Sequence, residues 1–225
     1  MKTVAAAGVL CCANACGVER EMAPGVLLIG KIENPKITES SGIAASRQFT
    51  NVFWTHNDGG KSETLFAINR QGRTLAEFKV AGANFDDWED IAADNERHLY
   101  LADTGDNAAK RKKISVFQID EPDPASSGVV RVTKRWQLRF PHGPVDCESL
   151  FIHGTNGYLV TKVTDDRRAE VYRFGLAASD GVQTVEFVAR LGIDSPVTAA
   201  DISPEGAAVA LVAKSGAFVY RLDGD

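Results

Sequence analysis

The sequence predicts an all-β fold, a β-propeller with about four recognisable four-stranded blades. Three observations predict this class of fold. A short motif recurs four times, strand-like segments follow each copy in the same order, and the chain after residue 16 has no segment of ten or more residues with a helical period. Repeats of this kind stack as similar sheets around a common axis.

The recurring motif is aligned on one apolar residue, which is Ile43, Ile91, Leu150 or Ile202. Successive copies lie 48, 59 and 52 residues apart, which is the length of a four-stranded blade. The motif predicts the innermost strand of each blade, at 41–44, 89–92, 148–151 and 200–203.

Further strands follow each motif. A second apolar segment is expected at 52–55, 99–102, 158–161 and 208–211. A third segment, in which aromatic and aliphatic residues are frequent, is expected at 65–68, 114–117, 171–174 and 217–220. An outer fourth strand is expected three times, at 74–80, 132–140 and 185–191. Turn signals such as Gln71-Gly72 and Asn156-Gly157 separate the segments.

The fourth repeat ends near residue 223, one strand short of a complete blade. Residues 26–32 form a good β segment and are available to supply the missing outer strand, which would close a ring of four blades. The alternative is a truncated copy of a larger ring, with an exposed strand edge.

The first 16 residues read as a secretory signal peptide. One lysine, a short apolar run and a small-x-small site precede Cys16, and this site also resembles the lipobox of bacterial lipoproteins, which would make Cys16 the lipidated residue. The expected location is therefore exported: a periplasmic or outer-membrane-anchored lipoprotein, or a freely secreted protein. Residues 17–36 form an N-terminal segment, and 37–225 form the propeller domain.

Charge and cysteine content exclude several classes of function. The net charge of −5 gives no basic field for nucleic acid, and a membrane would be reached only through a lipid anchor. Three of the four cysteines fall in the signal peptide, so that no disulfide framework is expected. Cys147 reads as a small buried apolar residue.

One face of the predicted propeller collects carboxylates. The loops that enter the inner strands and the loops between the second and third strands lie on the same face. Two blades repeat an acid-x-acid pair at one position, and alternate strand residues point the same way. Clustered carboxylates favour a hard cation, and Ca²⁺ is the expected ion. The expected metal ligands are Asp87, Glu89, Asp146, Glu148, Asp201 and Glu39.

The same face carries residues that we expect to contact a ligand. Asp and Asn are also favoured in tight turns, so a purely structural role stays open for each of them. Trp88 could stack on a sugar or base, or pack between blades. The expected ligand-binding residues are His56, Asn57, Asp58, Asp103, Asp106, Asn107 and Trp88.

Four segments resemble a family of exported bacterial β-propeller proteins, from about residue 37 to the end of the chain. They are 39–44 (ESSGIA), 54–60 (WTHNDGG), 87–92 (DWEDIA) and 103–107 (DTGDN). The family is distantly similar to SMP-30-like and phytase-like propellers, and its members are longer. SMP-30-like enzymes hydrolyse lactones with a divalent ion at the channel mouth, and phytase-like propellers bind phosphate through Ca²⁺. The resemblance implies a propeller and carries over no catalytic residue.

We therefore expect an exported propeller whose acidic channel mouth binds Ca²⁺ and serves to bind a small molecule or an envelope protein. One alternative is a metal-dependent hydrolase of a lactone or phosphoester, with the metal as Lewis acid. The other is a non-catalytic envelope scaffold without metal. The sequence leaves open whether the protein is an enzyme.

Overall fold

The computed structural model describes residues 20–24, 26–59, 63–163, 168–177 and 180–222, and their regular elements are β-strands. The predicted signal peptide, with Cys16, lies outside the described residues. Within these residues, no helix occurs that could cross a membrane.

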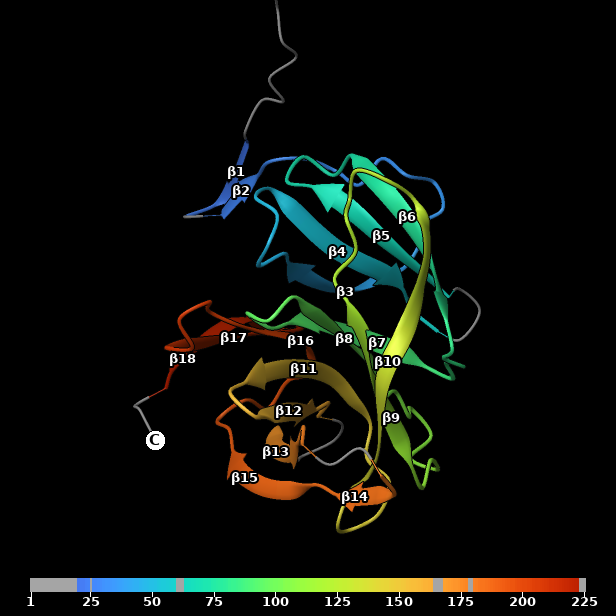
Figure 1. Cartoon of the computed structure of the whole chain (residues 1–225). Helices are drawn as coiled ribbons and strands as arrows, with labels where there is room; N and C mark the ends of the chain where they lie inside the picture. Colours follow the sequence, from blue (N-terminus) through green and yellow to red (C-terminus); the bar gives the residue numbers. More distant parts are fainter. Residues whose placement is uncertain (1–19, 25, 60–62, 164–167, 178–179, 223–225) are drawn as a thin grey trace, which may run out of the picture.

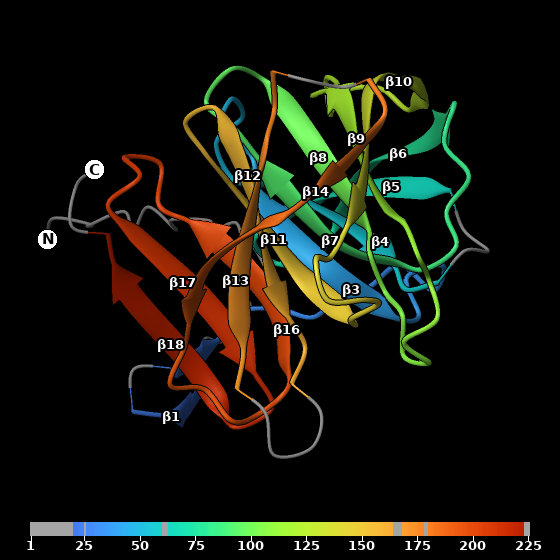
Figure 2. The same cartoon turned by 90° about the horizontal axis from the view of Figure 1, so that it is seen from below.

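Each of the four repeats forms one antiparallel sheet with its strands in chain order, which confirms the predicted all-β propeller (Figures 1 and 2). The predicted segments overlap the observed strands throughout. The first sheet holds β3 (Ser40–Ala45), β4 (Val52–Asn57), β5 (Thr64–Asn69) and β6 (Thr74–Ala81); the second β7 (Trp88–Ala93), β8 (His98–Asp103), β9 (Ile114–Asp120) and β10 (Gly128–Arg139); the third β11 (Cys147–His153), β12 (Asn156–Thr161), β13 (Glu170–Gly175) and β15 (Glu186–Arg190); and the fourth β16 (Val197–Ile202), β17 (Ala208–Ala213) and β18 (Gly216–Arg221).

The inner strands β3, β7, β11 and β16 lie next to one another around a common axis, and β16 and β3 touch least among these neighbours. Each inner strand has a register shift against its partner near its start. Such bulges bend a strand and redirect its side chains. Because all four shifts occur at similar places, they aim side chains at the axis at similar heights.

The outer edges of the first three blades are joined, which the repeat pattern did not predict. The first residues of β10 pair in parallel with β6, before β10 turns to pair antiparallel with β9. The short strand β14 (Val182–Thr184) pairs in parallel with the end of β10. Strand β10 is therefore hydrogen-bonded to the outer strand of the first blade and to β14, which precedes β15 of the third blade in the chain.

The core consists of three apolar clusters, one at each interface between consecutive blades. Trp54, Trp88 and Trp136 are almost fully buried in the first two, and burying a large apolar side chain contributes about 1.5–3 kcal/mol. The interface between the fourth and first blades is polar instead. There the Arg47 guanidinium donates to Asp201 Oδ1 at 3.1 Å and to the backbone carbonyl of Ile202.

The N-terminal segment does not close the ring as the sequence suggested. Strand β2 (Val26–Leu28) pairs with β1 (Arg20–Ala23) in a separate hairpin, and among the described residues β18 has no outer partner. The chain then runs along the turn between β5 and β6, where Glu33 N donates to Gly72 O at 3.1 Å. Gly30 lies so close to this turn that a Cβ would be 2.2 Å from Gln71 O. The contact keeps the segment beside the first blade.

Candidate functional site

Five carboxylates meet at the axis, where the inner strands of the second and third blades begin. We call Asp58, Asp87, Glu89, Asp146 and Glu148 the acid group. Glu89 belongs to two sets whose ligand atoms lie within 4.8 Å of one another, one with Asp58 and Asp87 and one with Asp146 and Glu148. The expected convergence of the two acid-x-acid pairs is therefore observed, and Asp58 joins them from the loop after β4.

Glu89 is the centre of the acid group and is only 3% exposed. Burial is the main cause that raises its pKa to about 8, and the negative charges of Glu148, Asp58, Asp87 and Asp146 contribute to this shift. Ser41 Oγ donates to Glu89 Oε2 at 3.3 Å. Among the described residues no cationic side chain pairs with Glu89, so its negative charge is uncompensated when it is ionised.

The pKa values of two neighbours are raised as well. Burial is the main cause for Asp87, and the charge of Asp58 adds to it, whereas Arg111 acts in the opposite direction. Burial also raises the pKa of Glu148, against the hydrogen bond from Lys162. The acid group therefore favours any positive charge, either protons or a cation.

Lys162 is an internal counter-ion that the sequence analysis missed. Its ammonium donates to Glu148 Oε1 and lies 3.4 Å from Asp146 Oδ2. It also donates to Asn107 Oδ1 at 3.1 Å. Asp146 Oδ1 accepts a bond of 2.7 Å from the backbone N–H of Asp106, so this half of the acid group is largely satisfied.

Gly105 lies directly against Glu89 and Asp87 in the other half of the acid group. A Cβ at this position would be 2.3 Å from Glu89 Oε1 and 2.4 Å from Asp87 Oδ2. Its N–H donates to Asp87 O at 3.2 Å, which fixes the loop against the carboxylates. A larger residue at position 105 would therefore displace the two carboxylates or the loop.

Asp90 follows Glu89 in β7 and connects three blades. Its Oδ1 accepts from Ile91 N at 2.9 Å, and its Oδ2 accepts from Leu150 N at 2.8 Å and Ala200 N at 3.3 Å. Burial raises the pKa of Asp90 well above its usual range, although the three N–H donors act against this shift. The Asp90 side chain thus connects the second, third and fourth blades at the axis through hydrogen bonds.

Three residues expected to bind a ligand are engaged in loop structure instead. Asn57 Oδ1 accepts from the backbone N–H groups of residues 38 and 39. Asp103 Oδ1 accepts from residues 86 and 87, while its Oδ2 pairs with Arg111 at 2.8 Å. Asp106 accepts from residues 110 and 111. This is the turn role that short polar side chains favour.

His56 and Trp88 are fully buried, which corrects the expectation that they face a ligand. Their rings stack at 4.0 Å, and Phe85 stacks on the other face of Trp88 at 4.3 Å. His56 Nδ1 lies 3.0 Å from the carbonyl of Asn57, and burial lowers the pKa of His56 to about 3. The imidazole is therefore neutral in the folded protein at physiological pH.

The remaining expected residues lie outside the acid group. Asp201 is paired with Arg47 at the polar seam between the fourth and first blades, because its position along β16 corresponds to Asp90 rather than to Glu89. Glu39 is exposed and belongs to neither of the converging sets. Asn107 is exposed and accepts a hydrogen bond from Lys162.

A cavity of about 520 Å³ adjoins the acid group. Asp146 and Lys162 line it together with Asn107, Arg168 and Arg190. This volume is in the range of small-molecule sites. Asp146, a member of the acid group, therefore also faces a space large enough for an organic ligand.

Solved structures resemble the chain only distantly. The computationally designed Ika4 protein matches with a TM-score of 0.40 at 11% identity, over 85% of this chain and 96% of that one. The hydrazine synthase of Kuenenia stuttgartiensis matches at 0.48 and 12%, over 82% and 53%, and the Dos1 propeller at 0.44 and 14%, over 82% and 44%. The chain thus spans about half the length of the last two.

No known protein family and no curated protein matches the sequence. The fold therefore rests on the strand topology described above, and no activity is transferred from the structural neighbours. The resemblance of the DWEDIA and DTGDN segments to an exported family stays a prediction.

Proposed function

We propose that this propeller binds a divalent cation, Ca²⁺ in preference to others, at the acid group and uses the cation to hold a small molecule or an envelope protein. The observation that carries the proposal is the position of Glu89, a buried carboxylate that is shared by two carboxylate sets. A cation there would replace the proton that burial and neighbouring charges otherwise impose.

The donor set determines the class of ion. The acid group offers carboxylate oxygens and no imidazole or thiolate, and hard oxygen donors suit Ca²⁺ or Mg²⁺ rather than Zn²⁺. Ca²⁺ accepts six to eight oxygen ligands in flexible geometry. It tolerates an irregular group built from the loop after β4 and the starts of β7 and β11.

Lys162 defines how the two halves of the group differ. It donates to Glu148 and forms an ion pair with Asp146, whereas Asp58, Asp87 and Glu89 have no such counter-ion in the described part of the chain. We assign the cation to this second half, beside Gly105, with Glu148 and Asp146 completing the coordination when Lys162 moves aside.

The adjoining cavity supports the first alternative, in which the small molecule at the site is a substrate. In that reading the protein is a metal-dependent hydrolase of a lactone or phosphoester, and the cation would polarise the substrate oxygen. An assay of such substrates with Ca²⁺ and with EDTA decides whether the propeller is an enzyme. Hydrolysis that EDTA abolishes would favour the enzyme.

A metal-free envelope scaffold is the second alternative. Several carboxylates are already paired with arginine or lysine, and large apolar side chains are exposed on the fourth and third blades, Val219 at 71% and Phe187 at 52%. Exposed apolar surface of this kind marks protein contacts.

Calorimetric titration with Ca²⁺ tests the proposal. We expect one site in the wild type and its loss in Glu89→Gln. Glu186→Gln is the matched control, because Glu186 is a surface carboxylate of β15 that pairs with Arg173. Unchanged binding in Glu89→Gln contradicts the proposed site, and no binding in any variant favours the scaffold.

Export is part of the proposed function and depends on residues 1–16. We propose that the signal peptide directs the chain out of the cytoplasm and that Cys16 receives the lipid. Labelled palmitate should enter the wild type in its host and not Cys16→Ser. Absence of label in the wild type, with normal secretion of Cys16→Ser, would leave a freely secreted protein.

A further inference from the structure

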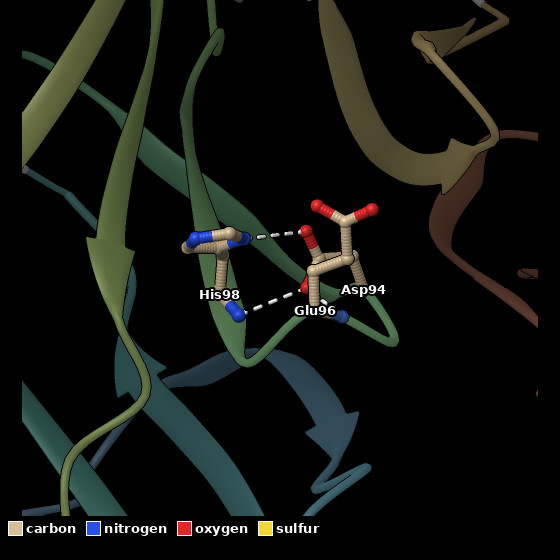
Figure 3. A group of neighbouring side chains, drawn as sticks. All are labelled: Asp94, Glu96 and His98. Atoms are coloured by element: carbon tan, nitrogen blue, oxygen red, sulfur yellow. Dashed lines mark hydrogen bonds and ion pairs between the residues drawn. The ribbon is translucent and has the colours of Figure 1, made fainter.

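A second group of potential ligands lies at the end of the propeller opposite the acid group. Asp94, Glu96 and His98 occupy the turn between β7 and β8 and the first position of β8, as Figure 3 shows. One donor atom from each lies within 4.8 Å of the others. This set differs from the acid group because it contains an imidazole.

Asp94 is held in a fixed orientation. Its Oδ1 accepts from the backbone N–H groups of Glu96 at 2.8 Å and His98 at 2.9 Å. Its Oδ2 accepts from His98 Nδ1 at 2.8 Å and from the Tyr100 hydroxyl at 3.0 Å. The Tyr100 hydroxyl therefore holds the carboxylate from behind, as outer partners of ligating carboxylates do at metal centres.

Glu96 completes the set. Its side chain is exposed, its carboxylate extends beside that of Asp94 (Figure 3), and within the described residues no hydrogen bond or ion pair satisfies it. Glu96 is thus free to bind without breaking an existing contact.

The three residues line a cavity of about 480 Å³. His153 and Arg47 line the same cavity, and Asn95 Nδ2 closes one side by donating to Pro204 O of the fourth blade at 2.8 Å. A cation held by three protein ligands would therefore keep a coordination position open to water or a small molecule.

We propose that Asp94, Glu96 and His98 bind a borderline transition-metal ion of the Zn²⁺ class. One imidazole and two carboxylates are ligands that Zn²⁺ accepts in tetrahedral geometry, with the fourth position for water. The proposal is independent of the Ca²⁺ site, since it uses other residues at the other end of the axis.

Binding replaces one hydrogen bond. The ion takes the place of the proton between His98 Nδ1 and Asp94 Oδ2, and the neutral ring carries its proton on Nε2 instead. Bonds of about 2.1 Å in tetrahedral geometry place two ligand atoms about 3.4 Å apart, so these two atoms, now 2.8 Å apart, must separate by a few tenths of an ångström. A turn side chain can make this adjustment by small rotations.

Titration with Co²⁺, a coloured substitute for Zn²⁺, tests the site in the whole protein. We expect one bound Co²⁺ with the visible absorption of a tetrahedral centre, displaced by Zn²⁺ and unaffected by excess Ca²⁺. Glu96→Gln and His98→Gln should both lose this absorption. His153→Gln, which changes a histidine of the same cavity outside the set, should keep it.

Tyr100→Phe separates a metal centre from a merely structural turn. Loss of an outer-shell partner should weaken Co²⁺ binding about tenfold while the absorption persists. Glu96→Gln removes an exposed carboxylate, so the melting temperature of this variant should match that of the wild type. The Co²⁺ titration of Glu96→Gln therefore tests the site even if His98→Gln fails to fold. Binding that is unchanged in Glu96→Gln, or no tetrahedral absorption in the wild type, would overturn the proposal.

Discussion

The ammonium of Lys162 donates to the carboxylate of Glu148, within the acid group at the propeller axis. Glu89, on the neighbouring inner strand, shares this group but has no cation beside it in the described part of the chain. The protein thus neutralises one half of the acid group with its own lysine. We assign the other half to a bound ion.

Removing the internal cation should strengthen Ca²⁺ binding. In Lys162→Gln the carboxylates of Glu148 and Asp146 lose their counter-ion, so without metal the stability should fall by about 2 kcal/mol, or roughly 4–8 °C in melting temperature. Calorimetry should show a lower Kd for Ca²⁺ than in the wild type, and added Ca²⁺ should restore the melting temperature. Weaker binding in this variant would instead make Lys162 part of the site.

Gly105→Ala should abolish cation binding. The added methyl would lie 2.3 Å from Glu89 Oε1, so the loop or the carboxylates must move. Gly128→Ala is the matched control, because a Cβ there meets nothing within 4 Å. We expect normal Ca²⁺ titration in Gly128→Ala and none in Gly105→Ala. Equal affinity in the two variants would exclude the space beside Gly105 as the cation position.

The contribution of Glu89 to stability without metal should fall as the pH rises from about 4.5 to 8. The pKa of Glu89 is about 8 in the folded chain and 4.5 when exposed, so the folded state holds a proton that the unfolded state has released. Stability is therefore full below the unfolded pKa and decreases through this window. Urea midpoints in EDTA should show this slope for the wild type and a flatter profile for Glu89→Gln. Saturating Ca²⁺ should also flatten it.

His56 should act in the opposite direction at lower pH. Its pKa of about 3 in the fold, against 6.5 when exposed, means that only the unfolded state takes up a proton between these values. Its contribution is therefore present above pH 6.5 and is lost as the pH falls. His56→Phe preserves an aromatic ring against Trp88 and should reduce the acid-side slope of urea midpoints. An identical slope in both proteins would mean that His56 is protonated in the fold.

Asp90→Asn should destabilise the protein far more than Asp201→Asn. Both residues occupy the same place in the repeat, but Asp90 is fully buried and accepts N–H groups from two other blades. An amide would direct its own NH₂ at one of these donors, at a cost of about 3 kcal/mol. Chemical unfolding of both variants measures the difference. Equal losses of unfolding free energy in the two variants would contradict the role of Asp90 in connecting the blades.

The strands were predictable from the sequence because the four repeats share one order of apolar segments. The convergence of Glu89 with Glu148 followed from the same repeat, since equal positions in neighbouring blades lie at equal heights. The parallel pairing of β10 with β6 was not predictable, because no local pattern specifies which distant edge a long strand will meet.

The partners within the site were harder to predict. Asn57 pairs with Ser40, and Thr161 pairs with Cys147, and both pairs lie at the start of an inner strand. Lys162 follows Thr161 as Asp58 follows Asn57, so Lys162 and Asp58 occupy equivalent positions in their blades. This equivalence depends on the bulges and becomes visible only once the register is known. Asp103 and Asp106 were expected as ligand contacts, but a sequence does not show whether a short acid faces solvent or its own loop.

The central claim is that the acid group binds a divalent cation through Glu89. The most direct measurement is the thermal melt of the chain from residue 17 onward, first in EDTA and then in millimolar Ca²⁺, for the wild type and Glu89→Gln. An ion at about 100 times its Kd adds roughly 2.7 kcal/mol, which is about 5–10 °C for a domain of this size. We predict this rise in the wild type and none in Glu89→Gln. A cooperative melt of the wild type at the same temperature in EDTA and in Ca²⁺ would contradict the claim.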